Sequence, residues 1–349
     1  MRVIITGGGT GGHVYPALEV AALAQEEADF VYFGSHRGME VEACERHGYK
    51  FQGFDSVPVY NYKSFAGAIA LAKLLRASIA AKRMMASMKP DVVFSTGGYS
   101  SAPVMRAAKA LGVPLAIHAC DTIPGRSLRM FANYAKVITS TFRATEQILG
   151  RPVERTGHPV RSELRRAVSN RFPEENVVVV LGGSGGAKFL NEMVPQAARL
   201  LPNIKVLHSA GKTQYDQATH LITGIEDRYD MRPYFEADIM AKVYQTATLA
   251  IARSGSTVSE FAMAQLPSIL VPLPTSADNH QLRNAQEFEE MGASTIANQE
   301  TCTVEELASQ INVWLKDKNK QESAAHALSE WDMPDATFRI WSAVKNAAS

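Results

Sequence analysis

The stretch Met1-Arg2-Val3-Ile4-Ile5-Thr6 runs directly into the glycine-rich segment Gly7-Gly8-Gly9-Thr10-Gly11-Gly12. The same order returns in the second half of the chain, where Asn176-Val177-Val178-Val179-Val180-Leu181 leads into Gly182-Gly183-Ser184-Gly185-Gly186. Continuous apolar runs of this length are typical of strands buried on both faces. A glycine-rich turn after such a strand is typical of the first βα unit of a doubly wound sheet. The repeat therefore predicts two α/β domains, each opening with its own unit.

Further apolar runs alternate with helix-like segments and extend this pattern along the chain. In the first half they are Val3–Ile5, Phe30–Phe33, Val92–Phe94, Leu115–Ile117 and Val137–Ile138, and in the second half Val177–Leu181, Ile204–Leu207, Leu249–Ile251 and Ile269–Val271. Such alternation favours parallel sheets covered by helices. We predict domains at 1–160 and 161–331, with a terminal helix at 332–349 that returns to the first domain.

The composition indicates a globular protein with no bulk attraction to nucleic acid. Of the 349 residues, 46% are apolar and 20% are charged, and the formal net charge is +1. Cys44, Cys120 and Cys302 are too far apart for a disulfide framework or a cysteine-spaced zinc motif, which indicates a reducing compartment. A strand beginning at Arg2 leaves no room for a signal peptide. The most apolar helical stretch, Phe65–Met85, carries too many charges to span a bilayer. We therefore expect a cytosolic location.

The two glycine-rich turns each have other interpretations. Gly7-x-Gly9-x-x-Gly12 fits a dinucleotide fingerprint, but no carboxylate follows the second strand before Glu40, which disfavours NAD. Gly182-x-Ser184-x-Gly186 fits the nucleophile elbow of a hydrolase, with Asp278 and His280 following in the expected order. A loop that cradles phosphate oxygens fits both turns, because the amides of a helix N-terminus attract anions.

The segment Arg253–Glu260 ends one predicted strand and opens a helix. Thr257 and Glu260 have the spacing of a capping box, which is a purely structural role. Glu260 could equally accept hydrogen bonds from a pair of sugar hydroxyls at the edge of the sheet. The segment Ser276–Ala285 follows the next strand and supplies amide and imidazole groups at the same edge, where ligands bind in open α/β sheets.

Four motifs taken together resemble those of one known family. They are Gly9-Thr10-Gly11-Gly12-His13-Val14, Gly97-Gly98-Tyr99, Gly182-Gly183-Ser184-Gly185-Gly186-Ala187 and Arg253-Ser254-Gly255-Ser256-Thr257-Val258-Ser259-Glu260, joined by Gly157-His158-Pro159-Val160-Arg161 and Asn279-His280-Gln281. Their order resembles the MurG family of N-acetylglucosaminyltransferases, which convert lipid I to lipid II in peptidoglycan synthesis. The resemblance implies a GT-B fold of two Rossmann-like domains with an active cleft between them. It also implies a first domain for the lipid-linked acceptor and a second for UDP-N-acetylglucosamine.

The resemblance also assigns residues. Ser184 and its loop, with Arg161, would hold the diphosphate, Glu260 would bind the ribose, and His280 or Gln281 would bind the sugar. His13 and then Asp121 are the candidate bases, although His13 could instead be a structural histidine at a helix start. The implied UDP-N-acetylglucosamine contacts are Thr10, Gly11, Gly12, Asp121, Arg161, Ser184, Phe235 (through a backbone group near it), Ser256, Thr257, Glu260, His280 and Gln281.

No metal or other cofactor is expected for this transfer. The sequence has no Asp-x-Asp pair, the usual signature of a metal-bound diphosphate in the other glycosyltransferase architecture. A helix N-terminus and one arginine form a preorganised place for the charge of a departing diphosphate. Attack from the opposite face would invert the anomeric centre.

The helix from Phe65 has two interpretations. Its apolar residues could form a core-facing stripe with a solvated basic flank. The resemblance instead implies a surface that docks on anionic lipid through Phe65, Ile69, Lys73 and Arg76. This interpretation predicts a peripheral protein on the cytoplasmic face of the membrane.

Three departures from the family pattern leave the substrate open. The family usually has His-Glu-Gln-Asn where this chain has His118-Ala119-Cys120-Asp121. Gly185 stands in place of a glutamine, and His158 in place of an asparagine. A related transferase with another UDP-sugar or acceptor, or a non-catalytic binder of sugar nucleotides, therefore remains an alternative.

Overall fold

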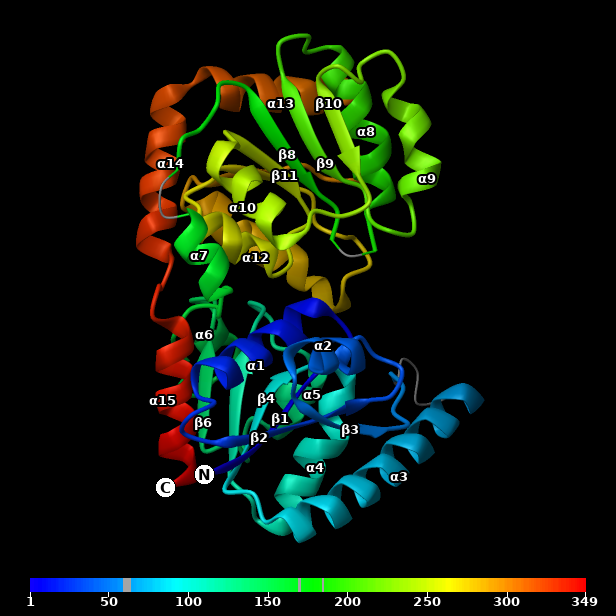
Figure 1. Cartoon of the computed structure of the whole chain (residues 1–349), viewed down its shortest axis with the longest axis vertical. Helices are drawn as coiled ribbons and strands as arrows, with labels where there is room; N and C mark the ends of the chain where they lie inside the picture. The colour runs from blue at the N-terminus through cyan, green and yellow to red at the C-terminus, as the bar shows by residue number, and fades with distance from the viewer. Residues whose placement is uncertain (59–63, 169–170, 184) are drawn as a thin grey trace. The chain divides into compact units, whose positions relative to one another are not determined.

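Two parallel sheets, each with its own helices, make up the chain (Figure 1). The computed structural model describes residues 1–58, 64–168, 171–183 and 185–349. These divide into unit 1, which is Met1–Pro159 with Pro334–Ser349, and unit 2, which is Val160–Met333. The predicted α/β class with two doubly wound parallel sheets is confirmed.

Unit 1 contains a parallel sheet in the order β3-β2-β1-β4-β5-β6-β7, seven strands among the described residues. Its strands are β1 (Arg2–Gly7), β2 (Asp29–Ser35), β3 (Lys50–Phe54), β4 (Val92–Gly97), β5 (Leu115–Ala119), β6 (Val137–Ser140) and β7 (Glu154–Arg155). Its helices are α1 (Gly11–Leu23), α2 (Glu40–His47), α3 (Phe65–Met88), the 3₁₀ turn η1 (Tyr99–Ser101), α4 (Ala102–Leu111), α5 (Arg126–Phe131), α6 (Thr145–Leu149) and α15 (Ala336–Ala348).

The central strand β1 is buried on both faces because its successive side chains enter different clusters. Val3 and Ile5 pack with α1 and with Trp341 of α15. Ile4 packs in the other cluster, which includes Ala81 of α3 and Met105 of α4. Alternation of side chains along a strand, with a helix layer on each face, explains why β1 reads as an unbroken apolar run. In Figure 1 the red α15 lies beside β6 of this sheet.

Unit 2 contains a parallel sheet in the order β10-β9-β8-β11-β12-β13, six strands within the described part of the chain. Its strands are β8 (Val177–Leu181), β9 (Lys205–Ser209), β10 (Tyr229–Arg232), β11 (Leu249–Ala252), β12 (Ser268–Leu270) and β13 (Ser294–Ile296). Its helices are α7 (Ser162–Val168), α8 (Lys188–Arg199), α9 (Tyr215–Ala218), the 3₁₀ turns η2 (Thr219–Ile222) and η3 (Ala277–Asn279), α10 (Ala237–Thr246), α11 (Thr257–Met263), α12 (His280–Glu290), α13 (Val304–Lys316) and α14 (Lys318–Trp331).

In each sheet the strand order reverses beside the first strand. β1 lies between β2 and β4 in unit 1, and β8 lies between β9 and β11 in unit 2. Ligands of open α/β sheets bind at the carboxyl ends of the strands at such a reversal. The glycine-rich turns and the Arg253–Glu260 segment all follow these strands, so the fold places them where a ligand site is expected.

No helix in the described ranges is both long enough and apolar enough to cross a membrane.

Candidate active site

In unit 1, the glycine-rich turn after β1 packs against the turn after β4. The Gly8 amide donates to the Gly97 carbonyl at 3.0 Å. A Cβ atom on Gly98 would lie 1.8 Å from the Gly8 carbonyl oxygen, and Gly98 has a φ of +84°. Only glycine tolerates both conditions. The two glycine motifs therefore form one backbone layer at the start of α1, with Thr10 as its N-cap residue.

His13 lies in the first turn of α1, close to Asp121. Its Nδ1 is 3.0 Å from Thr10 Oγ1, and its Nε2 is 4.0 Å from Asp121 Oδ2. The two side chains are 22% and 18% exposed, so both are reachable from solvent. The structure therefore brings together the two candidate bases, which are far apart in the sequence of unit 1. Gly11 and Gly12 precede His13 in the same turn.

Two buried histidines lie behind this pair. His118 Nδ1 is 2.9 Å from Thr139 Oγ1, and Thr141 Oγ1 is 3.3 Å from His118 Nε2 and 3.2 Å from His158 Nδ1. Burial lowers the pKa of His118 well below its usual value. Burial lowers the pKa of His158 to about 4, although nearby Asp121 acts in the opposite direction. Both rings are therefore neutral at physiological pH.

In unit 2, the second glycine-rich turn is held against the loop after β9. A Cβ atom on Gly186 would lie 2.1 Å from the Ala210 carbonyl oxygen, and Gly186 has a φ of +78°. The Gly185 carbonyl accepts from Thr213 Oγ1 at 3.0 Å and from Gln214 Nε2 at 3.2 Å. This turn ends at α8. Ser184, the predicted diphosphate contact, lies outside the described residues.

Glu260 makes its contacts through two side chains from other elements. The Tyr244 hydroxyl of α10 donates to Glu260 Oε2 at 2.5 Å, and Arg161 Nη2 lies 3.7 Å from Glu260 Oε1. Burial and the Glu260 charge raise the pKa of Tyr244 well above its usual value, so this hydroxyl keeps its proton. The structure thus joins Arg161 and Glu260, the predicted diphosphate and ribose contacts.

The capping-box interpretation of Thr257 and Glu260 is wrong. Helix α11 begins one residue earlier than that interpretation requires, because Ser256 is its N-cap residue and Thr257 is its first helical residue. The Glu260 carboxylate is turned toward Tyr244 and Arg161. Tyr244 itself was missed in the sequence, where it is one aromatic residue in an amphipathic helix with nothing to mark it as a partner of Glu260.

His280 and Gln281 open α12, beside the segment that leads into α11. Ser254 Oγ donates to the Gln281 carbonyl at 2.7 Å, and His280 Nδ1 lies 2.8 Å from the Ala277 carbonyl oxygen. Gln281 Oε1 accepts from the Leu273 amide at 2.9 Å. A histidine whose Nδ1–H is fixed by a carbonyl presents Nε2 as an acceptor, and the Gln281 amide group keeps its donor end for other partners.

Phe235 lies between β10 and α10, and its ring is only 1% exposed. A backbone group near this residue stays the predicted contact for the uracil edge.

The exposed residues of α3 overturn one interpretation of this helix. Its buried residues are mostly small, such as Ala70, Ala77 and Ala81, with Met85 near its end, so the predicted apolar residues do not form a core-facing stripe. The exposed fractions are 84% for Phe65, 45% for Ile69, 38% for Leu75 and 55% for Ile79. Lys73 pairs with Asp55 at 3.1 Å, whereas Arg76 is exposed.

Two alternative functions also depend on particular residues. Glu40 would be the ribose carboxylate of a dinucleotide site, but its side chain is fully buried and has no surface that a ligand could contact. The hydrolase interpretation requires Ser184, which lies outside the described residues.

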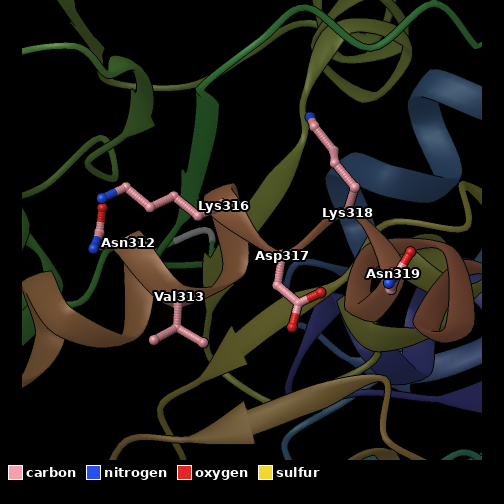
Figure 2. Close-up of a pocket in the computed structure, with 6 residues that line it drawn as sticks. All are labelled: Asn312, Val313, Lys316, Asp317, Lys318 and Asn319. Atoms are coloured by element: carbon pink, nitrogen blue, oxygen red, sulfur yellow. The ribbon is translucent and has the colours of Figure 1, made fainter.

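A surface hollow of about 530 Å³ lies elsewhere, at the junction of α13 and α14. It is lined by Asn312, Val313, Lys316, Asp317, Lys318 and Asn319. Figure 2 shows that the side chains of Lys316 and Lys318 point in different directions. The hollow contains none of the predicted site residues, and its charges do not converge on one point.

Comparison with known proteins gives matches along the whole chain. Residues 3–140 match the glycosyltransferase family 28 N-terminal domain, and residues 177–340 match the family 28 C-terminal domain. Two relatives are each named "UDP-N-acetylglucosamine--N-acetylmuramyl-(pentapeptide) pyrophosphoryl-undecaprenol N-acetylglucosamine transferase". The protein from Lactococcus lactis subsp. cremoris (strain MG1363) is 33% identical over 100% of both chains. The protein from Desulforudis audaxviator (strain MP104C) is 35% identical over 100% of this chain and 99% of its own.

A solved structure agrees with these relatives. The crystal structure of Acinetobacter baumannii MurG is 29% identical and has a TM-score of 0.79, with 99% of each chain covered. The predicted resemblance and GT-B fold are thus confirmed. This chain belongs to glycosyltransferase family 28, in the group of the MurG N-acetylglucosamine transferases.

Proposed function

We propose that this chain transfers N-acetylglucosamine from UDP-N-acetylglucosamine to lipid I, the undecaprenyl-diphospho-N-acetylmuramyl-peptide, to give lipid II. The observation that carries this proposal is full-length similarity, at 33% and 35% identity, to relatives named for this activity. The motifs that predicted the family and the reaction are spread along the chain, and all of them except Gly157–Arg161 lie within the matched segments 3–140 and 177–340. The transfer inverts the anomeric carbon of the sugar.

Unit 2 binds the donor in this proposal. Arg161 and the turn that enters α8 lie at the carboxyl edge of strands, where amides of a helix N-terminus and a guanidinium favour an anionic diphosphate. As the bond between sugar and phosphate breaks, charge grows on the departing UDP. A site already lined by donors stabilises that charge without reorganisation.

Glu260 reads the ribose in this proposal. A carboxylate accepts two hydrogen bonds from neighbouring hydroxyls, and Tyr244 fixes one of its oxygens at 2.5 Å. Arg161 lies 3.7 Å from Glu260, which supports a ribose contact next to a diphosphate contact. The adjoining Ser256, Thr257, His280 and Gln281 are assigned to the same ligand, the last two to its sugar hydroxyls.

Unit 1 activates the acceptor hydroxyl in this proposal. His13 takes the proton, and Asp121, 4.0 Å away, stabilises the charged ring that results.

A second candidate function rests on the carboxylate of Asp121. The family usually has an asparagine at this place, so Asp121 favours a related transferase with a different UDP-sugar or acceptor.

The membrane carries the acceptor, and we propose that α3 docks on its cytoplasmic surface. Phe65 and Ile69 are exposed at one end of this helix, and Arg76 lies further along it. Exposed apolar side chains next to basic groups bind anionic lipid surfaces. The protein would then be peripheral, held by this surface near its lipid-linked substrate.

Calorimetry tests the donor assignment. We expect UDP-N-acetylglucosamine to bind more tightly than UDP-glucose, and NADPH not to bind. Stronger binding of UDP-glucose would favour the second candidate function, and binding of NADPH with none of UDP-N-acetylglucosamine would refute both. A transfer assay with a short-chain analogue of lipid I then separates an enzyme from a non-catalytic binder.

A further inference from the structure

Unit 1 contains one cluster of potential metal ligands among the described residues, and the proposed transfer does not use it. His118, Cys120 and His158 each offer one ligand atom, and these atoms lie within 4.8 Å of one another. All three residues are buried. His118 lies in β5, Cys120 directly follows that strand, and His158 lies in the segment after β7, so the fold assembles the cluster from separate parts of the chain.

We propose that His118, Cys120 and His158 bind a Zn²⁺ ion. Two imidazoles and one thiolate are a donor set that suits this borderline-soft ion. No metal site was predicted, because the three cysteines are far apart in the sequence and cysteine spacing does not show that one cysteine lies beside two distant histidines.

The hydrogen bonds of His118 orient its ring in the way that a metal-binding histidine is oriented. The Thr139 hydroxyl donates to the Ile117 carbonyl at 3.3 Å, so it accepts the Nδ1–H of His118 at 2.9 Å. This fixes the tautomer and leaves the lone pair of His118 Nε2 directed at Thr141. Metal-binding histidines are oriented in this way, through their other nitrogen.

The Thr141 hydroxyl lies at a spacing that suits a metal ligand. Its Oγ1 is 3.3 Å from His118 Nε2 and 3.2 Å from His158 Nδ1, which is long for hydrogen bonds of this kind. Zinc–nitrogen bonds of about 2.1 Å at tetrahedral angles place neighbouring ligand atoms about 3.4 Å apart. Thr141 Oγ1 therefore bridges the two ring nitrogens at distances close to those between ligands of one ion, and it must move as the ion enters.

Binding of Zn²⁺ exchanges the ion for the proton of the Cys120 thiol. Zn²⁺ forms bonds to the Cys120 sulfur and to the two ring nitrogens, the S–H bond breaks, and one proton passes to the buffer. Thr141 moves from bridging the rings to the fourth position. Because Asp121 follows Cys120 directly, bound Zn²⁺ adds positive charge next to the His13–Asp121 pair, and we expect it to slow transfer.

Co²⁺ titration of the full-length protein, freed of metal by a chelator, tests the site without using activity. Tetrahedral Co²⁺ with a thiolate ligand gives intense visible bands and a sulfur-to-metal charge-transfer band. We expect these bands to saturate at one ion per chain and to disappear on addition of Zn²⁺. Calorimetry in two buffers should show release of one proton per ion.

Variants locate the ion. Cys120→Ser should lose the charge-transfer band, and His158→Asn, which removes one imidazole ligand, should lose tetrahedral binding. Thr139→Val, which removes only the hydroxyl that orients His118, should weaken binding about 10–100-fold. The control Cys302→Ser, at a partly exposed cysteine, should bind as the wild type does. Thermal melting without metal checks that each variant is folded.

Absence of the bands in the wild-type protein would overturn the proposal. So would bands that persist in Cys120→Ser or vanish in Cys302→Ser. If Cys120→Ser does not fold, unchanged binding by folded His158→Asn would do the same. These outcomes do not depend on which sugar the enzyme transfers.

Discussion

The Tyr244 hydroxyl donates a 2.5 Å hydrogen bond to Glu260 Oε2. The tyrosine is fully buried, and the carboxylate is 24% exposed. Glu260 Oε2 is therefore fixed by the buried tyrosine, while Oε1 lies 3.7 Å from Arg161 Nη2. This arrangement holds the carboxylate in one orientation, which would lower the entropic cost of binding the ribose in the proposed function.

Glu260→Ala should weaken binding of UDP-N-acetylglucosamine. Loss of charge-assisted hydrogen bonds to the ribose costs about 1.5–3 kcal/mol, or roughly 10–200-fold in affinity. Calorimetry with the nucleotide sugar measures this. Glu305→Ala, at an exposed glutamate in the first turn of α13, is a control that should leave affinity unchanged. Unaltered affinity in Glu260→Ala would show that the ribose contact lies elsewhere.

Tyr244→Phe should have a smaller effect through the same carboxylate. Removal of one hydroxyl frees Glu260 to move, and we expect donor affinity to fall about fivefold, which corresponds to about 1 kcal/mol. In the Glu260→Ala background the same change should have no further effect on affinity. Equal effects in both backgrounds would mean that Tyr244 acts independently of Glu260.

His13→Ala should reduce turnover while donor binding is kept. A general base contributes about 10²–10⁴-fold to the rate, and the removed ring lies in unit 1, whereas Arg161 and Glu260 lie in unit 2. A steady-state assay with a lipid I analogue gives the rate, and calorimetry gives the affinity. If turnover survives, Asp121 becomes the candidate base, and Asp121→Asn is then the decisive variant.

The predicted strands and the strands that were missed differ in burial. Apolar runs such as Val177–Leu181 were predicted because strands covered on both faces need apolar side chains throughout. Edge strands need fewer of them. β3 contains Gln52 and Gly53, and β10 reads Tyr-Asp-Met-Arg, so neither stands out as an apolar run. Long-range pairing with a neighbouring strand, which the local sequence does not show, decides that these segments are strands.

The site also contains residues that could be predicted from the sequence and residues that could not. Glycine turns could be located in the sequence because the close approach of Gly98 to Gly8 excludes every other residue. The partners of Glu260 could not, because Tyr244 reaches it from another helix. Whether Thr257 and Glu260 form a capping box depended on where α11 begins, and the N-cap position of Ser256 excludes that box.

Phe65→Asp should weaken binding to anionic vesicles. Phe65 is 84% exposed, and its insertion would bury apolar area worth about 1.5–3 kcal/mol, so we expect a loss of roughly tenfold or more. Sedimentation with phosphatidylglycerol vesicles measures it, and phosphatidylcholine vesicles show the charge dependence. Phe172→Asp, at a phenylalanine that is 58% exposed in unit 2, is the matched control. An equal loss in the control, or none in Phe65→Asp, would place the docking surface elsewhere.

His208 should make unit 2 sensitive to acid. Burial lowers the pKa of His208 from 6.5 to about 3, and its Nδ1 lies 2.7 Å from the Tyr229 hydroxyl. Between these pH values the unfolded chain binds a proton that the folded chain does not. The free energy of unfolding therefore falls as the pH falls, by about 1.4 kcal/mol per pH unit from this group.

His208→Gln removes that contribution, since the amide can still bond to Tyr229 but does not titrate. The variant should lose stability less steeply than the wild type as the pH is lowered from 6.5, even if it is less stable at neutral pH. Urea unfolding of both proteins across this pH range measures how steeply the free energy of unfolding of each protein falls with pH. Identical slopes would mean that His208 becomes charged without unfolding, which its full burial opposes because no water reaches the ring to solvate the charge.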